Sequence, residues 1–201
     1  MRASVGSALV LLSAFAAHAS ETAGVDSPAP LFTLRDATGA TQSLDKFKGK
    51  FVVLEWVNFD CPFVGKHYGS GAMQELQRTM TARGIVWLSI CSSAPGKQGY
   101  FEGDELKERI AAEHASPTAY LLDPEGSVGK MYNAKTTPHM YIIDPKGTLI
   151  YAGGIDNLAT TDKSDIAKAT NYVKVALQEA LDGKPVAVKN TRSYGCSVKY
   201  K

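Results

Sequence analysis

The sequence predicts a single α/β domain in which strands alternate with helices around one central sheet. The chain has 201 residues, of which 44% are hydrophobic and 21% charged, an ordinary composition and length for one globular domain. Short apolar runs of strand length alternate with stretches of helical spacing. Strands that alternate with helices form a parallel sheet covered on both faces, and a late strand–turn–strand pattern adds an antiparallel edge.

The first predicted elements follow from local hydrophobic patterns. Residues 31–34 alternate apolar and polar side chains like an edge strand. Residues 51–57 form an apolar run that only Glu55 interrupts, which is typical of a central buried strand. Helical spacing follows over 72–80, and 85–90 is a second buried strand.

The middle of the chain continues the alternation. We expect a helix over 104–114 and a short strand over 118–122. Asp123 and Pro124 then begin a short helix that runs to Met131, because aspartate is a good N-cap and proline fits the first helical position.

A hairpin and a long helix end the predicted domain. Strands over 140–143 and 149–152 flank the turn sequence of residues 144–147. The apolar stripe over 165–181 predicts the longest helix, which Gly183 closes.

The N-terminal residues have the features of a cleaved secretory signal peptide. Arg2 is followed by the apolar run 5–17 and by the small-residue cleavage pattern Ala17-His18-Ala19, so the exported protein begins at Ser20. The run is short for a membrane span, although an uncleaved anchor is the alternative. We therefore predict a periplasmic or secreted protein, without a membrane span after signal removal, in a compartment where disulfides form.

The predicted organisation has four parts. Residues 1–19 are the signal peptide, 20–30 a flexible lead-in, 31–183 the folded domain and 184–201 a C-terminal tail that carries Cys196.

Charge and cysteine content narrow the possible partners. The 22 Lys and Arg residues nearly balance 20 Asp and Glu residues, so no nucleic-acid partner or anionic membrane is predicted. Three cysteines are too few for a disulfide scaffold, and an odd number leaves at least one thiol without a partner in the chain.

Cys61 is the first candidate catalytic residue. It follows a buried strand, and Pro62 fits the first position of a helix, so Cys61 is expected at a helix N-cap. Backbone N–H groups and the positive end of the helix dipole favour a thiolate there, and Lys66 and His67 would add positive potential. Asp60 opposes this effect. The alternative is a buried, inert cysteine.

The chain resembles the thioredoxin-like redoxins over residues 29–181. Cys61 and Pro62 occupy the position of the redox cysteine, and Glu55 stands where thioredoxins carry a buried acid. Thr137-Pro138 precedes a strand like the cis-proline of the family, and residues 140–153 look like its closing hairpin. The resemblance implies a thioredoxin-like fold, a central mixed sheet with helices on both faces.

Two family motifs are absent. The Cys-x-x-Cys motif would need a second cysteine where Val64 stands. The peroxiredoxin Pro-x-x-x-Thr-x-x-Cys motif has Leu54 and Asn58 in place of its proline and threonine. The chain is therefore most similar to an exported redoxin of the broad peroxiredoxin and disulfide-reductase group with a different resolving arrangement.

Two cysteines are candidates for the resolving thiol. Cys196 lies on the tail, like the C-terminal resolving arm of some two-cysteine redoxins, or it is a spare exposed thiol. Cys91 ends a predicted strand and would approach Cys61 at the edge of the sheet, or it is a small buried apolar residue. We rank the pair 61–196 first and 61–91 second.

The sequence therefore predicts a thiol redox enzyme without a cofactor. Cys61 is the nucleophile, Cys196 is the resolving thiol that the resemblance implies, and Glu55, Thr137 and Pro138 complete the catalytic site. The partner is a redox protein or a small disulfide or peroxide, and no oligomeric state is predicted. Disulfide exchange is expected to exceed peroxide reduction, because the peroxiredoxin threonine that helps to hold peroxide is missing.

Two other functions stay open at this stage. One is a copper-binding thioredoxin-like module that uses Cys61, His67, His139 and Cys91, although such proteins have a second cysteine where Gly65 stands. The other is a redox-inactive binding module of the same fold.

Overall fold

The computed structural model describes residues 22–201, so the predicted signal peptide lies outside the described residues. The strands and helices follow in the order β1 (Thr33–Asp36), β2 (Thr41–Ser43), η1 (Leu44–Phe47), β3 (Val52–Trp56), α1 (Pro62–Tyr68), α2 (Ala72–Ala82), β4 (Val86–Cys91), α3 (Gly103–Ala112), β5 (Ala119–Leu122), α4 (Ser127–Met131), β6 (Thr136–Thr137), β7 (His139–Ile143), β8 (Leu149–Gly153), η2 (Lys163–Ala167), α5 (Tyr172–Leu181) and β9 (Cys196–Ser197).

The main sheet of the described residues has the strand order β2-β1-β5-β4-β3-β7-β8. Strands β3, β4 and β5 run parallel, and the remaining neighbours pair antiparallel. This confirms the predicted mixed sheet. Strand β3 lies between β4 and β7, and its five residues are all buried, as expected for the apolar run. Strand β1 is not an edge, because the unpredicted β2 pairs with it and takes the edge position.

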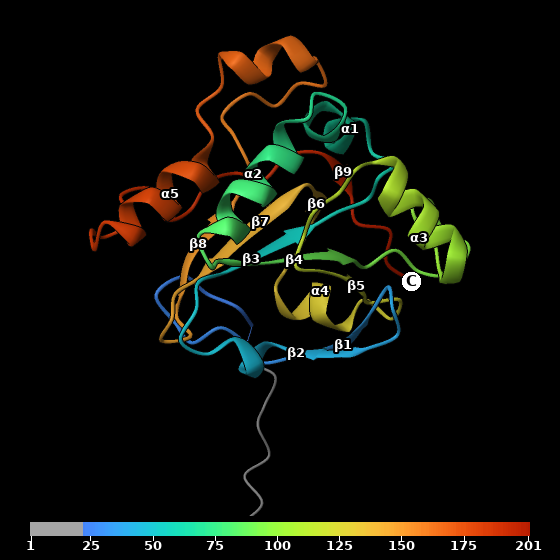
Figure 1. Ribbon diagram of the computed structural model, residues 1–201, viewed down its shortest axis with the longest axis horizontal. Helices are drawn as coiled ribbons and strands as arrows, with labels where there is room; N and C mark the ends of the chain where they lie inside the picture. Colours follow the sequence, from blue (N-terminus) through green and yellow to red (C-terminus); the bar gives the residue numbers. More distant parts are fainter. Residues whose placement is uncertain (1–21) are drawn as a thin grey trace, which may run out of the picture.

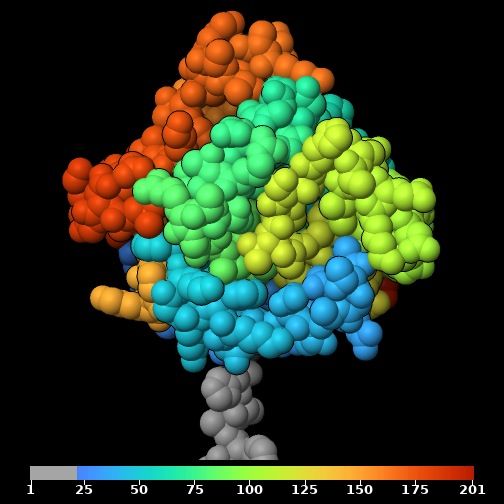
Figure 2. Space-filling view, viewed as in Figure 1, coloured from blue at the N-terminus to red at the C-terminus, as the bar shows by residue number. Residues whose placement is uncertain are grey.

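Helices cover both faces of the sheet (Figure 1). Helices α1, α2 and α5 pack on one face, where Cys61, Met73 and Leu177 belong to a single apolar cluster. Helix α4, η1 and the N-terminal segment pack on the other face, around Trp56 and Tyr132. Figure 2 shows that η2 and the chain beside it project from the molecule above α1.

The long helix predicted over 165–181 is divided in two. Its first part is the short helix η2, and α5 begins only at Tyr172. The side chain of Asn171 caps α5 by accepting from the N–H of Lys174 at 2.9 Å, and Asn157 accepts from the N–H of Thr170 at 2.7 Å. The break arises because these two asparagines take backbone donors that a continuous helix would use.

The helix predicted to begin at Asp123 begins later, at Ser127. Asp123 stands in the preceding turn, and its carboxylate accepts from the N–H of Gly129 at 2.8 Å and from the hydroxyl of Ser92 at 2.6 Å. Asp123 therefore satisfies N–H groups of α4 from outside the helix, and Pro124 is not the first helical residue.

The two segments outside the predicted domain are packed against it. In the lead-in, which was expected to be flexible, the N–H groups of Asp26 and Ala29 donate to Leu149 and Gly147 at 2.8 Å. In the tail, the N–H of Val198 donates to Lys135 at 3.0 Å, beside the pair β6–β9. These contacts join distant segments and have no periodic pattern, so no local feature of the sequence indicates them. Within residues 22–201 no helix is both long and apolar enough to cross a membrane.

Candidate functional site

Cys61 stands where the sequence predicts it, at the N-cap of α1. The backbone leaves β3 and turns through Asn58, whose carbonyl accepts from the N–H of Cys61 at 3.0 Å. Pro62 is in the first turn, with Cys61 in an extended conformation before it. The Cys61 side chain is only 1% exposed, so its thiol lies beneath other parts of the chain.

The amide of Asn58 holds the loop that follows β4. It donates to the carbonyl of Gln98 at 3.2 Å and accepts from the N–H of Asp60 at 2.9 Å. Gly99 packs so closely that a Cβ there would lie 2.1 Å from the Asn58 amide oxygen. Asn58 therefore has a structural role in shaping the turn before Cys61 and has both ends of its amide engaged.

The Thr137–Pro138 peptide bond is cis, as the resemblance implies. The Cys61 thiol donates to the Thr137 carbonyl, with 3.1 Å between sulfur and oxygen. The Thr137 hydroxyl is buried and has no partner of good geometry among the described residues. This hydroxyl is available to donate to the sulfur when Cys61 loses its proton.

The C-terminal tail brings Cys196 to the same place. Strand β9 pairs antiparallel with β6, with Cys196 opposite Thr137. Gly195 has φ +130°, and a Cβ at this position would lie only 2.0 Å from the Thr137 carbonyl oxygen. Only glycine permits this approach, so Gly195 allows the tail to lie directly on the cis-proline loop.

The pKa values of the Cys61 and Cys196 thiols shift in opposite directions. Burial alone would raise the pKa of Cys61, but hydrogen bonds from the Cys196 thiol, from Thr137 and from the backbone of Cys196 and Val64 lower this pKa below its ordinary value. Burial, together with the neighbouring Cys61, raises the pKa of Cys196 to about 11. The pKa of Cys61 therefore lies below that of Cys196, so Cys61 loses its proton first.

Cys91 has a different environment. It ends β4, and its thiol donates to the carbonyl of Gly99 at 3.3 Å. Burial raises the pKa of Cys91, which keeps the thiol protonated. These contacts agree with the alternative that the sequence left open, a small buried residue.

Glu55 is fully buried, as the resemblance implies for the acid of β3. Its carboxylate accepts from Trp87 and Ser89 at 2.8 Å, and from Gln77 and Tyr68 at 3.0 Å. Burial raises the pKa of Glu55 despite these donors. The acid therefore joins β3 and β4 to α1 and α2 below the helix that carries Cys61.

Lys66 and His67 do not supply the positive potential that the sequence suggested. The ammonium of Lys66 is buried and pairs with Asp156 at 3.1 Å, so its charge is compensated. Burial lowers the pKa of His67 to about 4, against the opposing effect of Asp156, so this imidazole is neutral near pH 7. The lowered pKa of Cys61 depends on the hydrogen bonds at its own sulfur instead.

The residues considered for copper are separated. Side chains alternate along β7, so His139 lies on the face opposite Met140, which packs in the same cluster as Cys61. The Nδ1 atom of His139 accepts from the N–H of Lys135 at 3.3 Å and lies 3.1 Å from the Tyr141 hydroxyl. Across residues 22–201, no three His, Cys, Asp or Glu side chains gather to hold a metal ion. His139 therefore lies on the face of the sheet opposite the cluster that contains Cys61.

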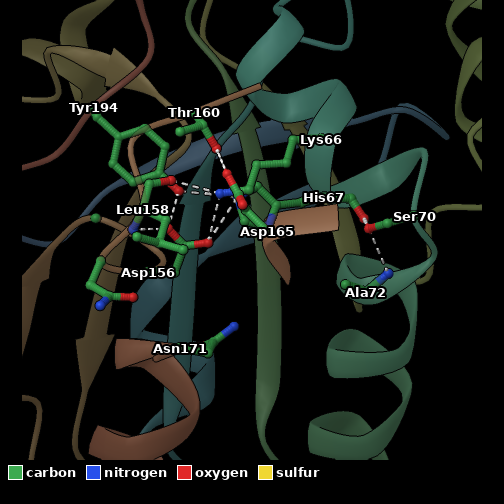
Figure 3. A network of polar contacts seen from close by, with 12 residues as sticks. Lys66, His67, Ser70, Ala72, Asp156, Leu158, Thr160, Asp165, Asn171 and Tyr194 are labelled. Carbon is green, nitrogen blue, oxygen red and sulfur yellow. Dashed lines mark hydrogen bonds and ion pairs between the residues drawn. The ribbon is translucent and has the colours of Figure 1, made fainter. Parts of the chain in front are cut away.

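Sequence reasoning missed Asp156 and Tyr194. Figure 3 shows the Lys66 ammonium and the Tyr194 hydroxyl both directed at the Asp156 carboxylate. The Tyr194 hydroxyl also lies 3.2 Å from Nε2 of His67. No motif signals this cluster, since its members come from α1, from the chain after β8 and from the tail.

Solved structures of similar fold come from several bacteria. A hypothetical protein from Sinorhizobium meliloti has 22% identity and a TM-score of 0.72, with 90% of this chain and 97% of that chain covered. An uncharacterized conserved protein from Geobacillus kaustophilus has 26% identity and a TM-score of 0.74, with 89% and 93% covered. The thioredoxin domain of a thiol-disulfide oxidoreductase from Bacteroides vulgatus has 19% identity and a TM-score of 0.52, with 73% and 97% covered.

These similarities establish the thioredoxin-like fold. No curated protein matches the sequence significantly. The sequence profile of the AhpC/TSA family matches residues 25–152, more than half of the chain, and the match includes β3, Cys61 and the closing hairpin. With its low-pKa cysteine at the start of α1, the chain is a thiol redox protein and belongs to the AhpC/TSA family.

Proposed function

We propose that this protein is an exported thiol–disulfide oxidoreductase that cycles between a dithiol and a Cys61–Cys196 disulfide. The observation that carries the proposal is the placement of Cys196 opposite Thr137, whose carbonyl accepts from the Cys61 thiol. This arrangement gives Cys61 a second thiol without a Cys-x-x-Cys motif. The signal-like N-terminus supports export to a compartment where disulfides are substrates.

The reaction has two balanced steps. The Cys61 thiolate attacks one sulfur of a substrate disulfide, a mixed disulfide forms and the first substrate thiolate leaves. The Cys196 thiolate then attacks the Cys61 sulfur, the second substrate thiolate leaves and the Cys61–Cys196 disulfide remains. The substrate gains two electrons, and an external dithiol must return two electrons to the protein.

The pKa values of the pair suit this order. Cys61 loses its proton first because its pKa is lowered while that of Cys196 is raised. The neighbouring Cys61 is one cause of the raised pKa of Cys196. When Cys61 enters a mixed disulfide it loses its charge, so Cys196 releases its proton more readily for the second step.

The contacts of Asn58 and Arg109 favour a disulfide over peroxide as the oxidant, because both side chains are already held by other groups. Peroxide reduction needs donors that hold both oxygens beside the thiolate. The Asn58 amide is engaged by the loop after β4. Arg109 is held by Asp60 at 3.2 Å, Glu113 at 3.1 Å and the carbonyl of Phe59 at 3.1 Å. Peroxide reduction is the second candidate, because the family match favours it.

The tail must move during the cycle. Cys61 is almost completely covered while β9 pairs with β6, so a substrate disulfide reaches the sulfur only after the tail swings away. The β6–β9 pair has two residues in each strand, so opening it breaks few backbone hydrogen bonds. The closed tail protects the thiolate, and the open tail admits the substrate.

The test compares two oxidants on the reduced protein lacking residues 1–19. Thiolate release from a chromogenic aromatic disulfide and loss of hydrogen peroxide are measured at the same pH, and the oxidised product is mapped by mass spectrometry. We expect faster reaction with the disulfide and a Cys61–Cys196 link within one chain, with Cys61→Ser inactive and Cys91→Ser unchanged. A faster peroxide reaction, or a product linked only through Cys91, would overturn the proposal.

A further inference from the structure

We propose that Tyr194, held by Asp156, is a positioning residue that docks the tail so that Cys196 meets Cys61. This inference rests on the proposed function, since it explains how the second thiol is presented. It concerns a residue that touches neither the substrate nor the reacting sulfur atoms.

The Tyr194 hydroxyl donates to the carboxylate of Asp156, which residues outside the tail hold in place. One carboxylate oxygen of Asp156 pairs with the buried Lys66 at 3.1 Å, and the other accepts from the N–H of Leu158 at 2.9 Å. Lys66 also donates to the carbonyl of Leu158 at 2.6 Å. Asp156 therefore keeps its orientation and partners when the tail is away (Figure 3). The carboxylate is a preorganised docking point.

Tyr194 is the part of the tail that reaches this point. Its hydroxyl donates to Asp156 and lies 3.2 Å from Nε2 of His67. Its ring packs edge-on against Phe63, with centroids 5.9 Å apart, and lies 5.7 Å from the Lys66 ammonium. A single aromatic side chain thus joins the tail to α1 by one hydrogen bond to a charged group and by ring contacts.

Helix α1 carries both the nucleophile and the docking contacts. Cys61 caps the helix, while Phe63, Lys66 and His67 contact Tyr194 from within it. Because α1 is a single short helix, the docked Tyr194 side chain has a fixed position relative to the Cys61 sulfur. Two residues later the tail presents Cys196, after the close approach at Gly195. When Tyr194 is docked against α1, the Cys196 thiol therefore lies beside the Cys61 thiol.

The predicted effect is on the effective concentration of Cys196. A docked tail keeps the second thiol near the first, whereas a loose tail samples many positions and closes the disulfide less often. A hydrogen bond to a charged group contributes enough to change the docked population about tenfold. The attack of Cys61 on the substrate does not need the docked tail, so the second step slows while the first does not.

The test uses Tyr194→Phe, which keeps the ring and removes the hydroxyl. The matched control is Tyr172→Phe, because Tyr172 lines the same hollow of about 540 Å³ and its hydroxyl makes no hydrogen bond within residues 22–201. A chromogenic aromatic disulfide releases one thiolate on attack and a second on closure, so stopped-flow absorbance separates the two steps. The pKa of Cys61 is measured from the ultraviolet absorbance of its thiolate as a function of pH.

For Tyr194→Phe we expect closure about tenfold slower, an unchanged or faster first release, and a Cys61 pKa closer to its ordinary value because the Cys196 donor is less often in place. Tyr172→Phe behaves like the wild type in all three measurements. An unchanged closure rate and an unchanged Cys61 pKa in a folded Tyr194→Phe protein would overturn the proposed docking role. Absence of a Cys61–Cys196 disulfide in the wild type would instead overturn the proposed function.

Discussion

Cys61 lies just after the end of β3 and Cys91 is the last residue of the neighbouring parallel strand β4, yet the pKa values of their thiols shift in opposite directions. The pKa of Cys61 lies below its ordinary value because donors from α1, Thr137 and Cys196 outweigh burial. The pKa of Cys91 lies above it because burial outweighs the nearby hydrogen bonds, and its thiol donates to Gly99. Both side chains are nearly inaccessible, so exposure does not explain the difference.

The comparison shows that hydrogen-bond donors, rather than position at the sheet edge, distinguish the reactive thiol. A helix begins immediately after Cys61, and the tail adds a second thiol beside it. After Cys91 the chain enters a loop, and burial raises the pKa of this thiol despite hydrogen bonds from Ser93 and Tyr120. A parallel sheet brings both cysteines to one edge, but only at Cys61 do the hydrogen-bond donors outweigh burial.

The largest expected effect is the difference between the Cys61→Ser and Cys91→Ser variants in the rate of disulfide reduction. Cys61→Ser should lower the rate of disulfide reduction at least about 1,000-fold, since the nucleophile is lost. Cys91→Ser should stay within about twofold of the wild type, because the residue touches no reacting atom. Stopped-flow thiolate release measures both variants. Comparable losses in the two variants would contradict the distinction between them.

The pH dependence of alkylation sharpens the comparison. Labelling of Cys61 by iodoacetamide, read by mass spectrometry, should rise through a pKa below the usual value of about 8.5, whereas Cys91 should label only at higher pH. Cys196→Ala should move the Cys61 profile upward by about one pH unit, because one hydrogen bond to the thiolate disappears. A profile that does not move would remove Cys196 from the causes of the low pKa.

The smallest effect concerns stability at alkaline pH. The folded pKa of Cys91 is raised, so its contribution to stability is present below the unfolded value of about 8.5 and is lost as pH rises toward the folded value. Cys91→Ala should lower the free energy of unfolding by about 1 kcal/mol at pH 7, because a buried sulfur is removed. Above about pH 8.5 the variant should lose stability with a slope smaller by up to about 1.4 kcal/mol per pH unit. Urea unfolding at several pH values measures this slope, and equal slopes would show that Cys91 does not titrate in this range.

Much of the fold could be predicted because its signals are local. The apolar run that became β3 and the turn sequence between β7 and β8 act within a few residues, and both elements lie where they were expected. The Cys61-Pro62 pair also indicated a helix start correctly. The break before α5 was missed because it depends on Asn157, a residue outside the helical pattern.

The partners of the site residues could not be predicted in the same way. Lys66 was interpreted as a source of positive potential, but Asp156 lies ninety positions later in the chain and compensates it. His139 was considered as a copper ligand together with Cys61, but the alternation of β7 directs it to the other face. Such errors arise because the charge and direction of a side chain depend on contacts between distant segments.

The sequence by itself determined the α/β class, the central strand and a cysteine at the start of a helix. Each of these depends on hydrophobic periodicity or on the conformational preference of one or two residues. Only the tertiary structure decided which donors surround the Cys61 sulfur and which cysteine faces it. The tail has no periodic pattern, and it reaches Thr137 because Gly195 permits close backbone contact and Tyr194 finds a carboxylate that Lys66 already holds in place.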